Sequence, residues 1–378
     1  MRQSHFNLFK RTLKEGRLLW LLKQGLKIPL YRLDAASGMV PQSLLGPIQG
    51  IFFVTYACNL RCYFCDLPTR HIEYVKKKER TELSREEKLS VIDDFRAIGT
   101  TGVGFTGGEP GLLPEIYDLV KRCSRHRLVS HLSTNGYAFR SVESCERYLD
   151  AGLKAASISI DGPEHIHNRI RGRKDSYEQC LQAVRNILEV RARKSPDFSV
   201  VTTTVITKDN IDVIPEVVKE LKAMGIDKIG FMPVHDIGLD YDREKRKTEF
   251  EVSDPSPVDK VIHYLKELQQ EGVVENTPAY LELFEDSFSG KPLPIRCYAG
   301  YTTVEVDSWG DVYPCLYWAF DKRSFGNIRQ KSLAQFWAGE EMRSMRKAAG
   351  QCRDCYWNCQ TELNLLVSKK RVPGGMVS

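Results

Sequence analysis

The sequence predicts an α/β protein built on a parallel β-sheet, and two observations support this fold class. Between about residues 50 and 235, short apolar runs alternate with amphipathic stretches, which is the pattern of successive strand–helix units. The chain has 378 residues and 42% apolar content, so it is long enough for a barrel-sized core with an appended domain. We therefore expect six strand–helix units followed by a small C-terminal α+β domain.

Six short segments have the length and composition of buried strands. They are residues 51–55, 101–105, 129–133, 156–160, 199–204 and 228–232. Amphipathic segments between them predict helices at 85–98, 113–125, 141–151, 176–192 and 211–224. Ser84 is a suitable N-cap for the first of these helices, and Glu86 and Glu87 are favourable in its first turn.

The N-terminal segment holds most of the net charge. Residues 1–33 contain eight Lys or Arg and only one acidic residue, Glu15, so this segment is +7 and the rest of the +6 chain is −1. A nearly neutral remainder argues against a nucleic acid partner. Apolar residues recur in the segment at helical spacing, namely Phe6, Phe9, Leu13, Leu18, Leu22 and Leu26.

We expect the helix of this segment to end at Pro29, since proline lacks the N–H that a helix interior requires. Two placements fit its composition: on an anionic membrane surface, or packed across one end of the barrel. No apolar run approaches the ~20 residues of a membrane-spanning helix. With an odd count of 11 cysteines and no recognisable signal peptide, we expect reduced thiols and a cytoplasmic location. In the first of the two placements, residues 1–33 would dock on the inner face of the membrane.

Three cysteines follow the first predicted strand in the spacing C-x3-C-x2-C: Cys58, Cys62 and Cys65. Three such thiolates suit an iron–sulfur cube and leave its fourth iron open. The motif Gly-Gly-Glu-Pro at 107–110 follows the second strand, and Ser-x-Asp-Gly at 159–162 ends the fourth. A structural zinc site is the alternative for the triad, but it gives no reason for the other motifs.

The triad, GGEP and SxDG motifs, in this order, resemble the radical S-adenosylmethionine (SAM) superfamily. The resemblance implies a partial (β/α)6 TIM-type barrel, with its active site at the C-terminal ends of the strands. It also implies a [4Fe–4S] cluster held by the triad, with SAM chelated to the open iron. Reductive cleavage of SAM would then give a 5'-deoxyadenosyl radical that removes a substrate hydrogen.

The same resemblance implies a set of SAM-binding residues: Gly107, Gly108, Glu109, Asn135, Ser159 and Arg171. The glycines would let the backbone approach the methionine part of SAM, and Glu109 would accept from its amino group. Arg171 would pair with the SAM carboxylate, a task suited to a planar guanidinium. For Asp161, a role at the site and a purely structural turn remain alternatives.

Other cysteines and histidines outside these motifs carry weaker signals. His165 and His167 form an isolated H-x-H, which we expect to be solvated or supporting rather than metal-binding. Cys123, Cys145 and Cys180 fall within predicted helices and are expected to be small buried apolar residues.

A second group of cysteines lies in the last eighty or so residues: Cys297, Cys315, Cys352, Cys355 and Cys359. The first two flank a predicted hairpin that turns at Gly310, and a helix is expected at 333–346. The arrangement resembles the C-terminal SPASM and twitch extensions of radical SAM enzymes, which hold auxiliary [4Fe–4S] clusters. The resemblance implies one auxiliary cluster ligated by four of the five cysteines; Cys297 and Cys315 are the securest, and which of the last three is spare stays open. Structural zinc is again the alternative.

These observations divide the chain into four parts: a basic helical segment at 1–49, the barrel at 50–235, a helical bridge at 236–290, and the cluster domain at 291–378. The function implied is hydrogen abstraction from a lipid, a lipid-linked sugar or a small alcohol, leading to oxidation or to C–C or C–S bond formation. An external donor such as flavodoxin or ferredoxin would supply electrons. Peptide modification is the alternative reaction, and a zinc-stabilised or electron-transfer protein is the alternative of a different class.

Overall fold

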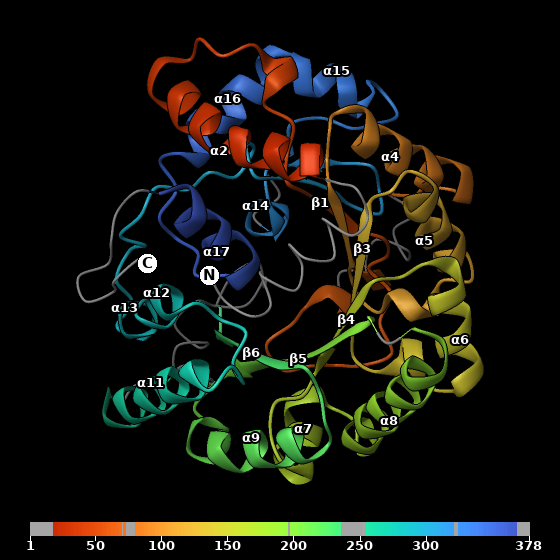
Figure 1. The fold of residues 1–378 in the computed structure, drawn as a ribbon, viewed down its shortest axis with the longest axis vertical. Helices are drawn as coiled ribbons and strands as arrows, with labels where there is room; N and C mark the ends of the chain where they lie inside the picture. Colours follow the sequence, from red (N-terminus) through yellow and green to blue (C-terminus); the bar gives the residue numbers. More distant parts are fainter. Residues whose placement is uncertain are drawn as a thin grey trace.

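The computed structural model describes residues 18–69, 71–72, 80–195, 197–235, 252, 255–320 and 324–368. Within them, one sheet has the strand order β6-β5-β4-β3-β2-β1-β7-β8. Strands β1 to β6 each pair in parallel with the next strand along the chain. The sheet curves into an open barrel with α4, α5, α6, α8 and α9 around its outside (Figure 1). This confirms the predicted α/β fold with a partial barrel.

All six predicted strands are present, with ends that move by one or two residues. They are β1 (Gln49–Phe53), β2 (Gly102–Thr106), β3 (Val129–Thr134), β4 (Ala155–Ser159), β5 (Ser199–Ile206) and β6 (Lys228–Pro233). The helices of the barrel are α4 (Arg85–Ala97), α5 (Ile116–Arg125), α6 (Val142–Ala151), α7 (Glu164–Arg171), α8 (Ser176–Lys194) and α9 (Ile214–Ala223). Four short 3-10 helices also occur, η1 (Gln42–Leu44), η2 (Pro110–Leu112), η3 (Tyr137–Phe139) and η4 (Ile211–Val213).

Helix α4 begins as the sequence predicts, because Ser84 and Glu87 form a capping box. Helix α7 is not among the helices predicted from the sequence. Its signal is short but present: Ile166 and Ile170 are four residues apart and buried, and Gly172 ends the helix with φ +67°.

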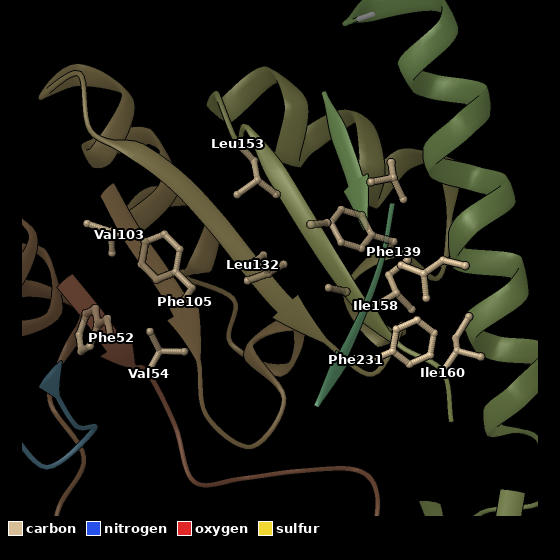
Figure 2. Close-up of a cluster of buried hydrophobic side chains, with 14 of the residues drawn as sticks. Phe52, Val54, Val103, Phe105, Leu132, Phe139, Leu153, Ile158, Ile160 and Phe231 are labelled. Atoms are coloured by element: carbon tan, nitrogen blue, oxygen red, sulfur yellow. The ribbon is translucent and has the colours of Figure 1, made fainter. Parts of the chain in front are cut away.

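The core lies between the outer face of the sheet and the surrounding helices. Phe52, Phe105, Leu132 and Ile158 are fully buried there and follow one another across four neighbouring strands (Figure 2). Burying each such side chain stabilises the fold by about 1.5–3 kcal/mol. Since side chains alternate along a strand, the intervening positions face the inside of the barrel.

The C-terminal region continues the barrel sheet. Strands β7 (Thr303–Val306) and β8 (Val312–Tyr313) form the predicted hairpin, and β7 also pairs in parallel with β1, placing Glu305 opposite Ile51. Its helices are α11 (Pro255–Gln270), α12 (Pro278–Leu281), α13 (Phe284–Phe288), α14 (Leu316–Phe320), α15 (Leu333–Ala338), α16 (Glu340–Ala349) and α17 (Asn358–Val367). The single helix predicted at 333–346 is wrong, because Gly339 adopts an extended backbone that ends α15 and begins α16.

The N-terminal helix α2 (Leu18–Ser37) contradicts the predicted stop at Pro29, which lies inside it. Contacts with the barrel hold the helix on both sides of the proline: the Lys27 ammonium donates to the Gly99 carbonyl at 2.9 Å, and the Tyr31 hydroxyl donates to the Gly46 carbonyl at 2.7 Å. These contacts offset the cost of an interior proline, which is about 3 kcal/mol. Phe6, Phe9 and Leu13 lie outside the described residues. No helix of the described part is long and apolar enough to cross a bilayer.

Candidate active site

The predicted motifs gather at the C-terminal ends of β1 to β4. The cysteine triad follows β1, the GGEP motif follows β2, Asn135 follows β3, and Asp161 follows β4. Parallel strands carry these ends to the same rim of the barrel. The rim therefore joins segments that are about a hundred residues apart in sequence.

The two glycines of GGEP are required by the backbone of the triad loop. Gly108 donates its N–H to the Thr55 carbonyl at 2.7 Å, and Glu109 donates its N–H to the Ala57 carbonyl at 2.8 Å. A Cβ on Gly107 would lie 2.4 Å from the Thr55 oxygen, and one on Gly108 would lie 2.0 Å from the Ala57 oxygen. Gly107 also has φ +141°, which side chains rarely adopt. The glycines thus let two protein segments touch, whereas the sequence suggested an approach to SAM.

Glu109 is fully buried and connects two of the motifs. Its carboxylate accepts from the Gly111 N–H at 2.8 Å, the Asn135 N–H at 2.8 Å and the Thr134 hydroxyl at 2.9 Å. Burial raises the pKa of Glu109 to about 7, against the opposing effect of these donors. The Thr134 hydroxyl lies within hydrogen-bond distance of both carboxylate oxygens, so groups of the protein surround this carboxylate.

Arg171 links the SxDG motif to the triad. Its Nε donates to Asp161 Oδ2 at 2.5 Å, and its Nη1 lies 3.7 Å from the sulfur of Cys62. Asp161 is itself fully buried and accepts from the Val205 N–H at 3.0 Å. The guanidinium therefore pairs with a protein carboxylate beside a triad sulfur, so Asp161 orients Arg171; this contact differs from the turn considered for Asp161 from the sequence.

The end of helix α7 supports the triad loop directly. The Tyr63 N–H donates to the Ile170 carbonyl at 3.0 Å, and Gly172 packs on Arg61, where a Cβ would lie 2.4 Å from the Arg61 oxygen. His167 on this helix is buried, and its Nδ1 accepts from the Asp161 N–H at 3.1 Å. Burial lowers the pKa of His167 to about 4, so it is neutral at pH 7. This fits the supporting role expected for it.

Asn135 and Ser159 complete the predicted set. The Asn135 side chain donates to Asn59 Oδ1 at 2.8 Å and lies 3.8 Å from the Cys58 sulfur, which brings the third motif to the triad. Ser159 faces the inside of the barrel. Cys123, Cys145 and Cys180 are buried in helices, as expected.

A cavity of about 690 Å³ occupies the barrel interior and its rim. Cys65, Gly107, Ser159 and Arg171 line it on the side of the motifs. On the C-terminal side it is lined by residues from helix α17 and the segment before it, including Trp357, Cys359 and Glu362. Helices α17 and α12 lie at the open side of the curved sheet (Figure 1). One cavity therefore reaches both groups of cysteines.

Four of the C-terminal cysteines share one apolar cluster, while Cys359 lines the cavity and lies near Cys355. Cys297, Cys315, Cys352 and Cys355 pack together with Tyr313, Tyr317 and Trp318. Burial raises the pKa of Cys315, Cys352 and Cys355, and the neighbouring Cys297 raises it further. For Cys359, burial and then the Glu305 carboxylate raise the thiol pKa to about 11.

Several cavity residues were missed by the sequence analysis: Glu275, Glu362, His235 and Trp357. Trp357 lies between Cys355 and Cys359 of the C-terminal group, whereas the other three lie outside any recognised motif, and only the fold brings them to the barrel. Glu305 was missed too. It is buried, its two carboxylate oxygens have no hydrogen-bond partner among the described residues, and burial raises its pKa well above the ordinary range.

The thiol donors of both cysteine groups fit iron–sulfur clusters. Among the described residues, no three His, Cys, Asp or Glu side chains lie close enough to ligate one ion. Thiolates of a cubane bind separate irons and so need not converge on one point. Burial raises the pKa of Cys58, Cys62 and Cys65, so metal binding must displace their protons. The soft donor set and the adjoining cavity fit a cluster with a small-molecule partner.

An open parallel barrel whose rim carries three thiols beside a cavity fits a protein that works through a bound cluster. Comparison of the sequence with family models agrees. Residues 52–221 match the radical SAM superfamily, and residues 297–356 match the SPASM iron–sulfur cluster-binding domain. The chain belongs to the radical SAM superfamily. Its cofactors are [4Fe–4S] clusters and SAM, and like other members it needs an electron donor.

Relatives of known activity share about a quarter of its residues. The chain is 25% identical over 328 residues to the AdoMet-dependent heme synthase of Oleidesulfovibrio alaskensis, which covers 81% of this chain and 79% of that protein. It is 24% identical over 331 residues to the sporulation killing factor maturation protein SkfB of Bacillus subtilis, covering 87% and 74%. Among solved structures, Streptococcus suis SuiB bound to the precursor peptide SuiA has a TM-score of 0.63 at 16% identity, covering 90% of this chain and 79% of that one. That likeness shows the fold.

Proposed function

We propose that this enzyme abstracts a hydrogen atom from a substrate held between its two cysteine groups, and that the reaction is an oxidation or a C–C or C–S bond formation. The cavity carries the proposal, because its wall includes Cys65 of the triad and Trp357, which packs against the C-terminal cysteine cluster. A substrate within it lies in reach of both metal-binding regions. When bound, the clusters and SAM supply the radical and electron-transfer chemistry.

The residues of the chain prepare this cavity. Glu109 holds the second and third rim loops together with three donors, and it remains the proposed acceptor for the SAM amino group. Asp161 fixes the Arg171 guanidinium beside Cys62, leaving its remaining N–H groups for an anionic ligand such as the SAM carboxylate. Gly107, Gly108, Asn135 and Ser159 remain the other proposed SAM contacts.

We assign the auxiliary cluster to the four clustered cysteines, Cys297, Cys315, Cys352 and Cys355. Their mutual packing and the surrounding aromatic side chains support this set, and Cys359 stays on the cavity wall. A single auxiliary cluster then accompanies the radical-generating one. Flavodoxin or ferredoxin is the proposed source of electrons.

The test is anaerobic reconstitution of the chain with iron and sulfide. Two cubanes predict about eight iron atoms per chain, roughly four each. With a strong reductant and SAM, the enzyme should form 5'-deoxyadenosine. A colourless protein that binds zinc and does not cleave SAM would reject the proposal in favour of a structural or electron-transfer role.

Peptide modification is the second candidate reaction, and it is supported by the 24% identity to SkfB.

For the basic N-terminal segment, the proposal remains that it docks on the cytoplasmic face of a membrane. The substrate would then be a lipid or be linked to a lipid. Leu26 and Leu33 are seven residues apart on α2, and their side chains are 63% and 54% exposed. Both lie within residues 1–33, the segment of charge +7. Both features suit an anionic surface.

Flotation with vesicles tests this docking. Truncating residues 1–33 would remove the buried Tyr31, so replacing Leu26 and Leu33 by Glu is the cleaner change. We expect wild type to float with phosphatidylglycerol vesicles at low salt and the double variant to remain below. Val129→Gln, at an exposed apolar residue on the start of β3, is the control. Equal flotation of all three proteins would exclude α2 as the docking element.

A further inference from the structure

Three exposed basic residues lie around the loop that carries the cysteine triad: Arg61, Arg140 and Lys174. Arg61 belongs to the loop itself, where its Nη1 donates to the carbonyl oxygens of Cys58 and Leu60 at 3.1 and 2.9 Å. Its charge is therefore held directly over the residues that join the first two cysteines of the triad. Within the described ranges, none of the three basic residues forms an ion pair with a carboxylate.

The segment after helix α7 holds Lys174 beside this loop. The Arg61 N–H donates to the Arg171 carbonyl at 3.3 Å, and Lys174 lies three residues further along the chain. Arg173 lies there too, but its guanidinium forms an ion pair with Asp175. Lys174 therefore keeps a positive charge that a partner at this surface can meet.

Arg140 approaches the triad loop from the third rim loop. Its guanidinium carbon lies 4.4 Å from the centre of the Tyr137 ring. The same rim loop contacts the triad loop through Asn135, whose side chain donates to Asn59 Oδ1 at 2.8 Å. A guanidinium over an aromatic ring keeps its charge, so Arg140 extends the positive surface beside the triad.

At the C-terminal cysteine group, opposite charges balance. Cys352 is the one partly exposed member of the four clustered cysteines, and its sulfur lies 3.8 Å from a carboxylate oxygen of the exposed Asp354. Arg353, next to both in sequence, offsets that charge. The chain outside residues 1–33 has a net charge of −1, so the unpaired positive charge at the triad is a local feature.

We propose that Arg61, Arg140 and Lys174 form the docking surface for an acidic electron-transfer protein that reduces the triad site. The inference rests on the proposed function, because it places the electron donor at that same site. Attraction between opposite charges speeds the encounter of two proteins and orients them, and docking here brings the donor's redox centre to residues 58–65. In the transfer, the donor is oxidised by one electron and the triad site is reduced by one. Acidic flavodoxins and ferredoxins have this chemistry.

The experiment compares two reductants on the reconstituted, SAM-bound enzyme: reduced bacterial flavodoxin, and dithionite, which is too small to need a docking surface. The double variant Arg140→Glu, Lys174→Glu should lower the initial rate of 5'-deoxyadenosine formation with flavodoxin by about tenfold or more at low salt. Its rate with dithionite should equal that of wild type. Salt at about 0.5 M should remove most of the difference, because ions screen surface charges. Calorimetry at low salt should show weaker binding of flavodoxin to the variant.

The double variant Lys121→Glu, Arg125→Glu is the matched control. It makes the same change of charge near the C-terminal end of α5, at the opposite end of the barrel from the rim. We expect it to leave flavodoxin binding and both rates unchanged. An equal effect of the two double variants on the flavodoxin-driven rate would overturn the inference, because the attraction would then be unspecific.

Two further outcomes would also overturn it. Wild-type binding of flavodoxin by the variant at Arg140 and Lys174 would show that the donor docks elsewhere. Equal loss of activity with both reductants would show that these residues shape the SAM site instead. The proposed function is tested separately: it fails if wild type forms no 5'-deoxyadenosine with dithionite, whereas calorimetry with flavodoxin tests the docking surface in either case.

Discussion

The two cysteine groups differ in what surrounds them. Two triad sulfurs have polar or charged neighbours, Arg171 beside Cys62 and Asn135 beside Cys58, while Cys65 packs against an apolar cluster that includes Tyr56 and Trp309. The C-terminal four are enclosed by aromatic residues, with Tyr313 and Trp318 among their packing partners. Both groups are buried enough to raise the pKa of their thiols, so burial alone does not separate them.

This difference fits two kinds of metal site. A site that exchanges a charged ligand in each turnover needs hydrogen-bonding groups at its open side, and the triad has them. A resident cluster that only passes electrons is better served by an apolar enclosure that excludes water. The following predictions test this contrast, beginning with the largest effect.

Removing either cysteine group should have different consequences. With Cys58, Cys62 and Cys65 all changed to Ala, we expect no 5'-deoxyadenosine and about four iron atoms instead of about eight, because the open iron is lost. With Cys297 and Cys315 changed to Ala, iron should fall similarly while some SAM cleavage continues. Iron analysis and chromatography of the nucleoside measure both effects.

Cys123→Ala is the control for this comparison, since Cys123 is buried in α5 away from both groups. It should retain wild-type iron and cleavage. If the C-terminal variant retained full turnover on its substrate, the auxiliary site would be only structural. If it lost all SAM cleavage, the contrast between the two groups would fail.

Arg171→Lys should weaken SAM binding without releasing iron. Lysine cannot contact Asp161 and Cys62 together as the guanidinium does. Loss of a charge-assisted contact costs about 1.5–3 kcal/mol, or roughly ten- to hundredfold in Kd. Calorimetry with SAM measures the change, and Arg173→Lys at an exposed neighbouring arginine is the control. Unchanged affinity would remove Arg171 from the SAM site.

His167 should make the unfolding free energy depend on pH. Burial lowers its pKa in the folded protein from 6.5 to about 4, so the unfolded chain binds a proton first as pH falls. The neutral form is therefore stabilising above pH 6.5, and stability is lost between pH 6.5 and 4, by about 3 kcal/mol at most. Denaturant titrations of the metal-free protein should show a shallower loss in His167→Asn, whose side-chain oxygen preserves an acceptor. Identical slopes would contradict this assignment.

The strands were predictable because they leave local patterns, and the triad, which is the proposed metal site, leaves a local pattern too. Each of the six barrel strands is a short apolar run, and Cys58, Cys62 and Cys65 sit within eight residues. The helix end predicted at Pro29 is wrong, because tertiary contacts of Lys27 and Tyr31 outweigh the helix-breaking preference of proline. Propensity is a weak guide where packing is strong.

Glu275 and the Arg171–Asp161 pairing were not predictable for a different reason. Glu275 is an ordinary glutamate between α11 and α12, and only the curvature of the sheet brings it to the cavity. For Arg171 the sequence identified the residue, but the partner within the protein depends on the placement of α7, which was missed. Roles that depend on long-range neighbours require the fold.

The parallel pairing of β7 with β1 has a consequence for biosynthesis. Strand β1 ends at Phe53 and pairs with β2 on one edge, but the strand that pairs with its other edge, β7, begins only at Thr303. That edge of β1 therefore stays open while some 250 residues are translated. At ribosomal rates of about 5–20 residues per second, this delay lasts on the order of tens of seconds. An unpaired edge is a template for association with other chains. Deleting the C-terminal region would make that exposure permanent, so the barrel expressed alone should aggregate.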